Sequence, residues 1–258
     1  MINKLRILKH YLINHRLFNS INRKKIQLAK ILLKRFDNTI QYGHFKGIKL
    51  LSGIWNKEDL SSILIGFYEK EVIDDIFNLN KKFDTFINIG AGDGLYATGI
   101  AKKNIAKKVI AFEMSKKQQK LIIKISKLNN VHKKVCVQGY ADKEKLKTLL
   151  RFNNENLILI DIEGNEFNLL TTEILQLMKT SVIYVELHDK YFKNGKKLKN
   201  NLIKDASNFF NVSVIKQTGR NPFELNKLND LTNDQMWLAC SEGRGFTMNW
   251  LKLTPKKI

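Results

Sequence analysis

Short apolar runs alternate with segments of helical period from residue 83 onward. This alternation is typical of βαβ units that build a parallel sheet. We therefore predict an α/β, Rossmann-like fold with a mostly parallel seven-stranded sheet and helices on both faces. The strands are expected at residues 85–89, 108–113, 134–138, 157–161, 182–187, 212–216 and 236–240. The segment 218–234 shows no clear period and contains Gly219 and Pro222, so it is expected to form a long loop.

The first 45 residues have a different pattern. Leu5, Leu8 and Leu12 have the i, i+3, i+7 spacing of an amphipathic helix, and the pattern recurs further along. We expect two helices within residues 3–35, broken near residues 19–22, then a strand pair at 45–54 and a helix at 60–77. A chain of 258 residues is short for two full-sized domains. The prediction is a basic helical extension, 1–45, and one α/β domain, 46–258.

Charge adds a second feature to the extension. The chain carries a formal net charge of +21, and residues 1–50 hold twelve Lys or Arg against the single acid Asp37. Such a surface attracts the phosphates of nucleic acids, anionic lipids or phosphorylated glycan carriers. A general bias toward Lys, Asn and Ile explains the same excess. The apolar stripes of the extension either pack on the main domain, which we favour, or lie on an anionic membrane.

Composition also bears on where the protein works. No stretch approaches the roughly 18 consecutive apolar residues of a membrane span. Basic residues interrupt the N-terminal apolar positions, unlike a secretory signal. Cys136 and Cys240 are far apart and form no CxxC pair, which argues against a disulfide framework or a zinc site. We expect a cytoplasmic protein, with peripheral contact to the inner face of the membrane through residues 1–45 as an option.

A glycine turn follows the strand expected at 85–89, and a helix should begin near Leu95. Glycines let the backbone turn sharply and approach a ligand closely. A dinucleotide fingerprint, GxGxxG, would need its third glycine where Leu95 stands. The GxGxG spacing found instead is that of S-adenosylmethionine enzymes. The expected cofactor-binding residues of this turn are Asn88, Gly90, Ala91, Gly92 and Gly94.

Two further carboxylates follow the next two strands. Glu113 ends its strand about 20 residues after the turn, where a carboxylate can accept hydrogen bonds from both ribose hydroxyls. Asp142 follows the third strand and could meet the adenine amino group. An equally supported role for Asp142 is that of a helix N-cap.

Acids also cluster after the fourth and fifth strands. Asp161, Glu163 and Glu166 lie within six residues, and Glu186 and His188 end the fifth strand. In open α/β sheets the carboxyl ends of the strands border the ligand crevice. Asp161 is therefore expected to face the methionine part of the cofactor, whereas Glu166 suits an exposed helix start.

These motifs resemble the FkbM-like S-adenosylmethionine-dependent methyltransferases. The resemblance rests on Asp161-x-Glu163-Gly164-x-Glu166, with support from residues 66–69 and 88–94, and covers roughly residues 46–240. Asn88 departs from the acid that many methyltransferases carry there. The resemblance implies a class I methyltransferase fold, S-adenosylmethionine as cofactor, and methylation of hydroxyl groups on sugars or other small metabolites. Tyr68 and Glu69 are expected to close over the cofactor.

A hydroxyl acceptor gains from a general base within hydrogen-bond reach. We nominate His188, with Glu163 or Glu186 as the orienting or alternative base. No metal-binding residue is assigned, because a magnesium ion on Asp161, Glu163 and Glu186 is the less favoured alternative. Arg220 and Arg244 are candidates for binding an anionic group of the substrate, and the alternative for both is a surface role.

Three functions remain open at this point. The favoured one is an O-methyltransferase acting on a sugar or surface-glycan precursor. The second, an RNA or other nucleic-acid methyltransferase, is favoured by the charge. It is opposed by the fourth strand, which runs into Asp161-Ile162-Glu163-Gly164 and not into an NPPY or DPPY block. The third is a non-catalytic protein, which would bind the cofactor but transfer no methyl group.

Overall fold

The computed structural model describes residues 2–51, 58–150, 155–244 and 247–256. They form two compact units, each made of two chain segments. The helical unit comprises Met1–Tyr68 and Gly219–Gly245, and the sheet unit comprises Glu69–Thr218 and Phe246–Ile258. The predicted domain boundary at residue 45 coincides with none of the three points where the chain passes between these units, and it stays a prediction.

A seven-stranded sheet forms the centre of the sheet unit, with strand order β3-β2-β1-β4-β5-β7-β6. Neighbouring strands from β3 through β5 pair in parallel, and β7 runs antiparallel to both β5 and β6. The predicted α/β class and mostly parallel sheet are confirmed. The strands are β1 Phe83–Ile89, β2 Ala106–Phe112, β3 Val135–Gln138, β4 Asn156–Ile160, β5 Val182–Leu187, β6 Phe210–Lys216 and β7 Asn249–Pro255.

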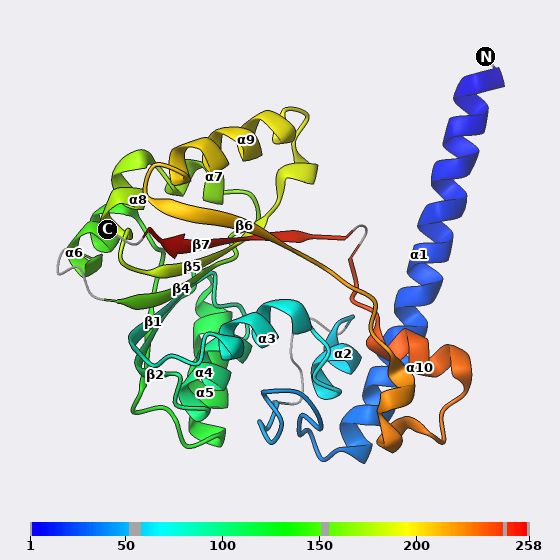
Figure 1. Cartoon of the computed structure of the whole chain (residues 1–258). Helices are drawn as coiled ribbons and strands as arrows, with labels where there is room; N and C mark the ends of the chain where they lie inside the picture. Colours follow the sequence, from blue (N-terminus) through cyan, green and yellow to red (C-terminus); the bar gives the residue numbers. More distant parts are fainter. Residues whose placement is uncertain (1, 52–57, 151–154, 245–246, 257–258) are drawn as a thin grey trace. The chain divides into compact units, whose positions relative to one another are not determined.

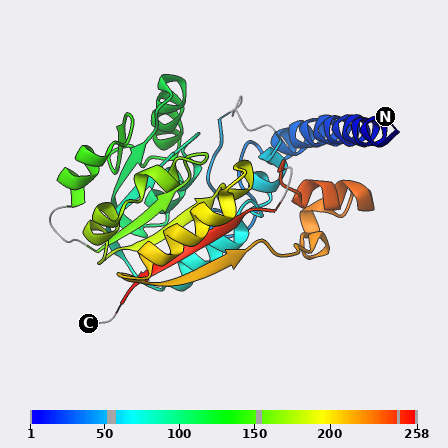
Figure 2. The ribbon, with the colours of Figure 1, turned by 90° about the horizontal axis from the view of Figure 1, so that it is seen from above.

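Helices cover both faces of this sheet (Figure 1). One face carries α3 Lys70–Asn78, α4 Leu95–Lys102 and α5 Lys116–Leu128. The other carries α6 Lys143–Leu150, α7 Glu166–Leu169, α8 Thr172–Leu177 and α9 Gly195–Ala206, and α9 runs beside the β6–β7 pair (Figure 2). Burial of apolar side chains between layers drives this packing. The core under α6–α9 includes Ile87, Ile158, Ile160, Ile183 and Leu253.

The strand predicted at residues 212–216 is confirmed as β6, but the strand predicted at residues 236–240 is wrong. Residues 236–240 form the end of helix α10, Asn233–Cys240, in the helical unit. Met236, Ala239 and Cys240 are buried while Trp237 is half exposed, which is helical and not alternating burial. Thr232 and Gln235 cap the helix reciprocally in a capping box. The true seventh strand lies at Asn249–Pro255, where no strand was predicted.

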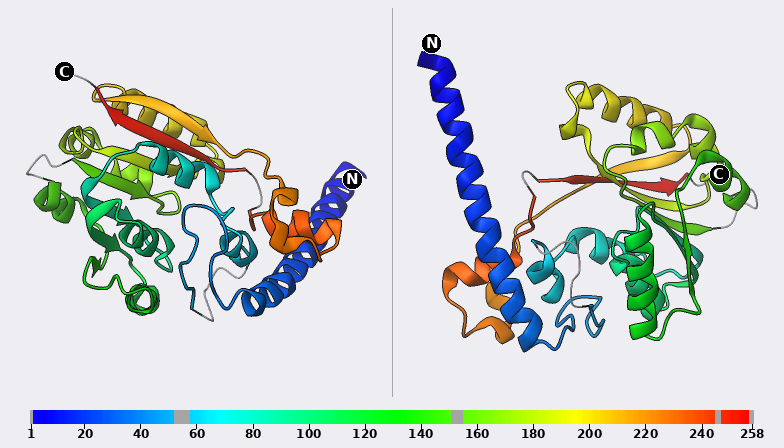
Figure 3. Two further views of the ribbon diagram at one scale, coloured as in Figure 1. Left: turned by 60° about the horizontal axis from the view of Figure 1, so that its bottom comes forward. Right: turned by 180° about the vertical axis from the view of Figure 1, so that it is seen from behind.

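The helical unit contains one long helix, α1 Ile2–Arg35, in place of the two predicted helices. The segment contains no Gly or Pro, and the modest propensity cost of Asn and Ser near residue 20 does not end a helix. It contacts α2 Leu60–Leu64 and α10 (Figure 3). The long loop predicted at 218–234 is confirmed as largely irregular, with 3-10 turns Pro222–Glu224 and Asn226–Leu228.

Two other predictions for residues 45–77 need correction. In place of a strand pair, the described residues show one isolated bridge between Thr39 and Lys49, and residues 52–54 lie outside the described part. The helix predicted at 60–77 is divided into α2 and α3. Gly66 has φ of 72° and a Cβ on it would lie 2.1 Å from the carbonyl oxygen of Tyr42, so the chain turns sharply there.

No helix among the described residues combines the length and the apolar character that crossing a membrane requires.

Candidate functional site

The glycine turn joins β1 to α4 with a backbone that glycine adopts readily. Gly90, Gly92 and Gly94 have φ values of 83°, 54° and 88°, in the left-handed region that L side chains disfavour. A Cβ on Gly90 would lie 1.7 Å from the carbonyl oxygen of Asp161. The turn therefore packs directly against the backbone that leaves β4, and α4 begins at Leu95 as predicted.

Glu113 is held against this turn at the end of β2. Its Oε2 accepts a hydrogen bond of 2.9 Å from the backbone N–H of Gly92, and its Oε1 accepts one of 2.7 Å from that of Ser115. Each carboxylate oxygen can accept more than one hydrogen bond, so capacity for ligand hydroxyls remains. The glycine turn and Glu113, the two strongest cofactor signals of the sequence, are thus joined by a hydrogen bond.

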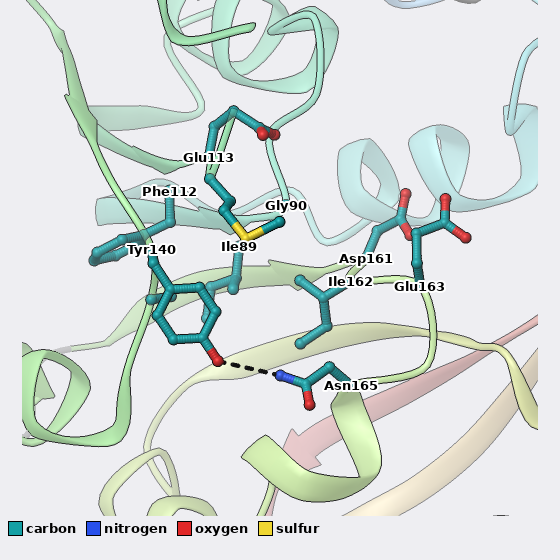
Figure 4. A pocket seen from close by; sticks show the side chains of 11 residues that line it. Ile89, Gly90, Phe112, Glu113, Tyr140, Asp161, Ile162, Glu163 and Asn165 are labelled. Atoms are coloured by element: carbon teal, nitrogen blue, oxygen red, sulfur yellow. Dashed lines mark hydrogen bonds between the residues drawn. The ribbon is translucent and has the colours of Figure 1, made fainter. Parts of the chain in front are cut away.

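A cavity of about 460 Å³ opens beside the turn and Glu113, at the carboxyl edge of the parallel strands. This volume lies in the range of small-molecule and cofactor sites. Figure 4 shows Glu113, Tyr140, Ile162 and Asn165 around it. Asn165 Nδ2 donates to Tyr140 Oη at 3.5 Å across one side. The full lining is Ile89, Gly90, Phe112, Glu113, Met114, Tyr140, Ala141, Asp161, Ile162, Glu163 and Asn165.

Several predicted cofactor residues do not line this cavity, among them Gly92 and Gly94 of the turn. Ala91 is buried, and its N–H donates to the carbonyl oxygen of Phe112. Asn88 is 1% exposed within β1, and its Oδ1 has no hydrogen-bond partner in the described part of the chain. Asp142 caps α6 by accepting from the N–H of Lys145 at 2.8 Å. The Lys145 ammonium, followed by this backbone hydrogen bond, holds the pKa of Asp142 below its usual range.

A cluster of acids surrounds the imidazole of His188, which follows β5. Nε2 of His188 lies 3.6 Å from Asp161 Oδ1, 3.4 Å from Glu163 Oε2 and 3.7 Å from Glu186 Oε2. His188 and Glu186 are buried, whereas the side chain of Glu163 is 74% exposed. The three nominated catalytic residues are therefore neighbours. Because Asp161 and Glu163 also line the cavity, the cluster adjoins it.

Glu166 anchors this cluster from within the protein, in contrast to the exposed helix start predicted for it. It is 0% exposed and accepts hydrogen bonds of 2.9 Å from the N–H groups of Gly164 and His188. Its Oε1 also lies 3.3 Å from Nδ1 of His188. A buried carboxylate needs such partners, and here they fix the turn after β4 to the end of β5.

The crowding of acids perturbs proton affinities. Burial, followed by the charges of Glu186 and Glu69, raises the pKa of Asp161 well above its usual range. Burial alone would lower the pKa of His188, but its contacts with Glu166 and Glu186 outweigh burial and raise it. Proton affinities displaced in this way are concentrated at functional sites, although structural ion-pair networks also produce them.

Tyr68 and Glu69 fall in different units. Glu69 is buried at the start of α3 and accepts a hydrogen bond of 2.7 Å from the Tyr96 hydroxyl, and its charge acts on Asp161. Tyr68 ends the first segment of the helical unit, where the Arg244 guanidinium lies 5.8 Å from the centre of its ring. Closure of Tyr68 over a cofactor remains a prediction.

Arg220 and Arg244 both pair with Glu242 in the helical unit. Nε of Arg244 lies 2.8 Å from Glu242 Oε2, and Nη1 of Arg220 contacts Oε1. The side chain of Arg220 is only 5% exposed, although it was placed in an open loop by its sequence context. A buried guanidinium that is already paired with a carboxylate serves to hold the fold together. The prediction that Arg220 binds an anionic group of the substrate therefore loses its main support.

Several site residues carried no chemical signal in the sequence. Phe112, Met114, Tyr140 and Ile162 line the cavity because each stands within two residues of the carboxyl end of a parallel strand. That position relative to the strand end is the signal that could have identified them.

The sequence matches no protein-family model and no curated protein. Its fold, in contrast, is similar to that of solved structures. The O-methyltransferase TomG from Streptomyces achromogenes, in complex with S-adenosylmethionine, aligns with a TM-score of 0.51 and 12% identity over 90% of each chain. A precorrin-6y C5,15-methyltransferase from Geobacter metallireducens aligns with a TM-score of 0.48 and 12% identity, over 84% of this chain and all of that one. The Rossmann-like methyltransferase fold predicted from the sequence is thus confirmed.

Proposed function

We propose that the chain is an S-adenosylmethionine-dependent methyltransferase that transfers the methyl group to an oxygen atom. One observation carries the proposal: the cavity at the carboxyl edge of the sheet is lined by Gly90 of the glycine turn and by Glu113, which is hydrogen-bonded to Gly92 of the same turn. This is where a Rossmann-like sheet places an adenosine-containing ligand. TomG, which shares the fold, is an O-methyltransferase solved with S-adenosylmethionine.

The residues around the cavity suit this cofactor. Glu113 would accept hydrogen bonds from the ribose hydroxyls with the capacity that Gly92 and Ser115 leave free. The apolar walls from Phe112, Met114 and Ile162 suit an adenine ring. Asp161 brings a carboxylate toward the positively charged methionine part. When bound, the cofactor supplies an electrophilic methyl group on a sulfonium.

The cluster around His188 suits an oxygen acceptor. As the acceptor oxygen bonds to the methyl carbon, the carbon–sulfur bond breaks and the hydroxyl proton must leave. Such a hydroxyl has a high pKa, so a base within reach lowers the barrier. His188 Nε2 is the nominated base, with the exposed Glu163 and the buried Glu186 beside it.

For the acceptor we propose a hydroxyl of a sugar or surface-glycan precursor, in a protein resembling the FkbM-like methyltransferases. The Asp161-x-Glu163-Gly164-x-Glu166 block supports this, because it brings the acid cluster to the edge of the cavity. A nucleic-acid acceptor has the net charge of +21 in its favour. Methyl transfer to RNA, but to no glycan precursor, would select that function. Cofactor binding without transfer to any acceptor would select the non-catalytic one.

We also propose that helix α1 contacts an anionic membrane surface on the cytoplasmic side. It carries ten Lys or Arg and no acid over 34 residues. Basic segments bind anionic lipid with about 1 kcal/mol per charge near the surface. The full chain is expected to cosediment with vesicles of phosphatidylcholine containing 30% phosphatidylserine, about tenfold more than with pure phosphatidylcholine. Equal cosedimentation with both would exclude this role.

The cofactor assignment predicts the effect of changing Glu113. Isothermal titration with S-adenosylhomocysteine should show binding to the wild type and at least about 30-fold weaker binding to Glu113→Ala, because two charge-assisted hydrogen bonds are lost at about 1–2 kcal/mol each. Glu144→Ala, an exposed glutamate in α6, serves as the control and should bind normally. No binding of either cofactor form to the folded wild type would refute the proposed function.

A further inference from the structure

Two carboxylates and an imidazole converge on one point beside the cavity. Asp161 follows β4, Glu186 lies in β5 and His188 follows it, and one ligand atom from each lies within 4.8 Å of the others. We infer that Asp161, Glu186 and His188 bind a divalent transition cation, Mn²⁺ or Zn²⁺. The inference rests on the proposed function for what the cation does, but not for where it binds.

The spacing of the ligand atoms fits a cation. Nε2 of His188 lies 3.6 Å from Asp161 Oδ1 and 3.7 Å from Glu186 Oε2, beyond the length of a good N–H···O hydrogen bond. Two ligand atoms at these separations, each about 2.1 Å from an ion, subtend about 120° at it. Such an angle suits a four- or five-coordinate site, so the same distances that are long for hydrogen bonds are natural for coordination.

An enclosed carboxylate oxygen without a hydrogen-bond partner and a buried imidazole face the same space. Oδ1 of Asp161 is fully enclosed and accepts no hydrogen bond in the described part of the chain. The His188 side chain is 3% exposed, and its Nε2 faces three carboxylates at 3.4–3.7 Å, of which that of Glu163 is the nearest. Leaving an enclosed carboxylate oxygen unpaired is costly, so a cation that satisfies it together with the neighbouring imidazole and carboxylate is favoured.

Glu166 holds the imidazole in the orientation that coordination needs. It contacts Nδ1 at 3.3 Å, on the ring side opposite to Nε2, and accepts from the backbone N–H of His188. Metal-binding histidines characteristically present the other ring nitrogen to a carboxylate or carbonyl in this way, which sets the tautomer and the ring orientation. Tyr191 stacks on the same ring at 5.4 Å between centroids and restrains it further.

The donor set selects the class of cation. One imidazole nitrogen with two carboxylate oxygens suits Mn²⁺ and Zn²⁺ better than Mg²⁺, which prefers oxygen ligands throughout. Three protein ligands leave coordination positions open. Since Asp161 also lines the cavity, an open position is available to an acceptor hydroxyl there.

A cation here changes the role of His188 in the proposed reaction. Nε2 becomes a ligand, and coordination lowers the pKa of the acceptor hydroxyl, so that its proton leaves more readily. Glu163, 74% exposed at the edge of the cluster, is the carboxylate that then takes the proton. The oxygen gains the methyl group, the carbon–sulfur bond breaks, and S-adenosylhomocysteine leaves.

The test is Mn²⁺ binding by the full chain, freed of metal with EDTA and then of EDTA by dialysis. Loss of the free-ion electron paramagnetic resonance signal should show one site in the wild type. In Glu186→Gln and His188→Ala the dissociation constant should rise at least about 100-fold, and in the surface variant Glu144→Gln it should not change. No binding at 1 mM Mn²⁺ or Zn²⁺, or equal binding by all variants, would overturn the inference.

Two further measurements keep the outcome decisive. If a cluster variant does not fold, electron spin echo modulation of wild-type-bound Mn²⁺ should still show a coordinated ¹⁴N nucleus, and its absence would overturn the site.

Titration of S-adenosylhomocysteine with and without Mn²⁺ separates the two proposals. Asp161 has two carboxylate oxygens and can contact the cation with one and the cofactor with the other, so equal affinity supports the cation site. Competition would assign these acids to the cofactor's ammonium group alone and overturn the site. Loss of cofactor binding under both conditions removes the proposed function alone.

Discussion

Gly90→Ala is expected to abolish binding of S-adenosylhomocysteine and to lower the free energy of unfolding by about 2–5 kcal/mol, the sum of left-handed strain and overpacking. The added Cβ would lie 1.7 Å from the carbonyl oxygen of Asp161, and backbone atoms cannot yield as a flexible side chain does. Either β1 or the chain after β4 must move, and both border the cavity. Urea denaturation and isothermal titration measure the two effects.

Gly47→Ala provides a matched control for this variant. Gly47 has φ of 87°, close to the 83° of Gly90, but a Cβ there would have no heavy atom within 4 Å. It therefore incurs the left-handed strain, about 1–2 kcal/mol, without the collision. Equal destabilisation by the two substitutions would show that the close approach of the turn to Asp161 has no energetic weight.

Glu166→Ala is expected to destabilise the protein by about 2–6 kcal/mol, because two buried N–H groups lose their acceptor at about 1–3 kcal/mol each. Both bonds, from Gly164 and His188, are 2.9 Å long and enclosed. The imidazole also loses the carboxylate beside Nδ1. Unfolding in urea gives the stability, and the Mn²⁺ affinity gives the effect on the cluster.

Glu166→Gln separates the two roles of this side chain. Its amide oxygen can still accept from one N–H group, so the loss of stability should be smaller than in Glu166→Ala, while the charge beside Nδ1 is removed. Stability equal to that of the wild type in Glu166→Ala would mean that water satisfies the freed N–H groups and that the anchor is dispensable.

The sequence alone predicted the parallel strands β1 to β5 and the site along their carboxyl ends. Strands such as β4 and β5 are buried throughout, so they appear as continuous apolar runs. Gly90 and Glu113 were identified because their roles depend on distance from a strand end, which local sequence encodes. Asp161, Glu163, Glu186 and His188 meet because neighbouring parallel strands end at the same edge.

The antiparallel strand β7 and the buried role of Glu166 could not be predicted in this way. Trp250, Leu251 and Leu253 of β7 are buried, but the run is short, Lys252 interrupts it, and two lysines follow it. Its identity as a strand comes from pairing with β5 and β6, which are distant in sequence. Glu166 was read as exposed because acids favour helix starts, and its partners become visible only after β4 and β5 are placed side by side.

The position of β7 has a consequence for biosynthesis. This strand separates β5 from β6, yet it follows β6 by the whole second segment of the helical unit. While the nascent chain lacks residues 249–255, the open edge of β5 presents unpaired backbone groups, and β6 has no neighbour in the described sheet. Because such non-local pairing forms slowly, we expect newly made chains to depend on chaperones until β7 has paired with β5 and β6.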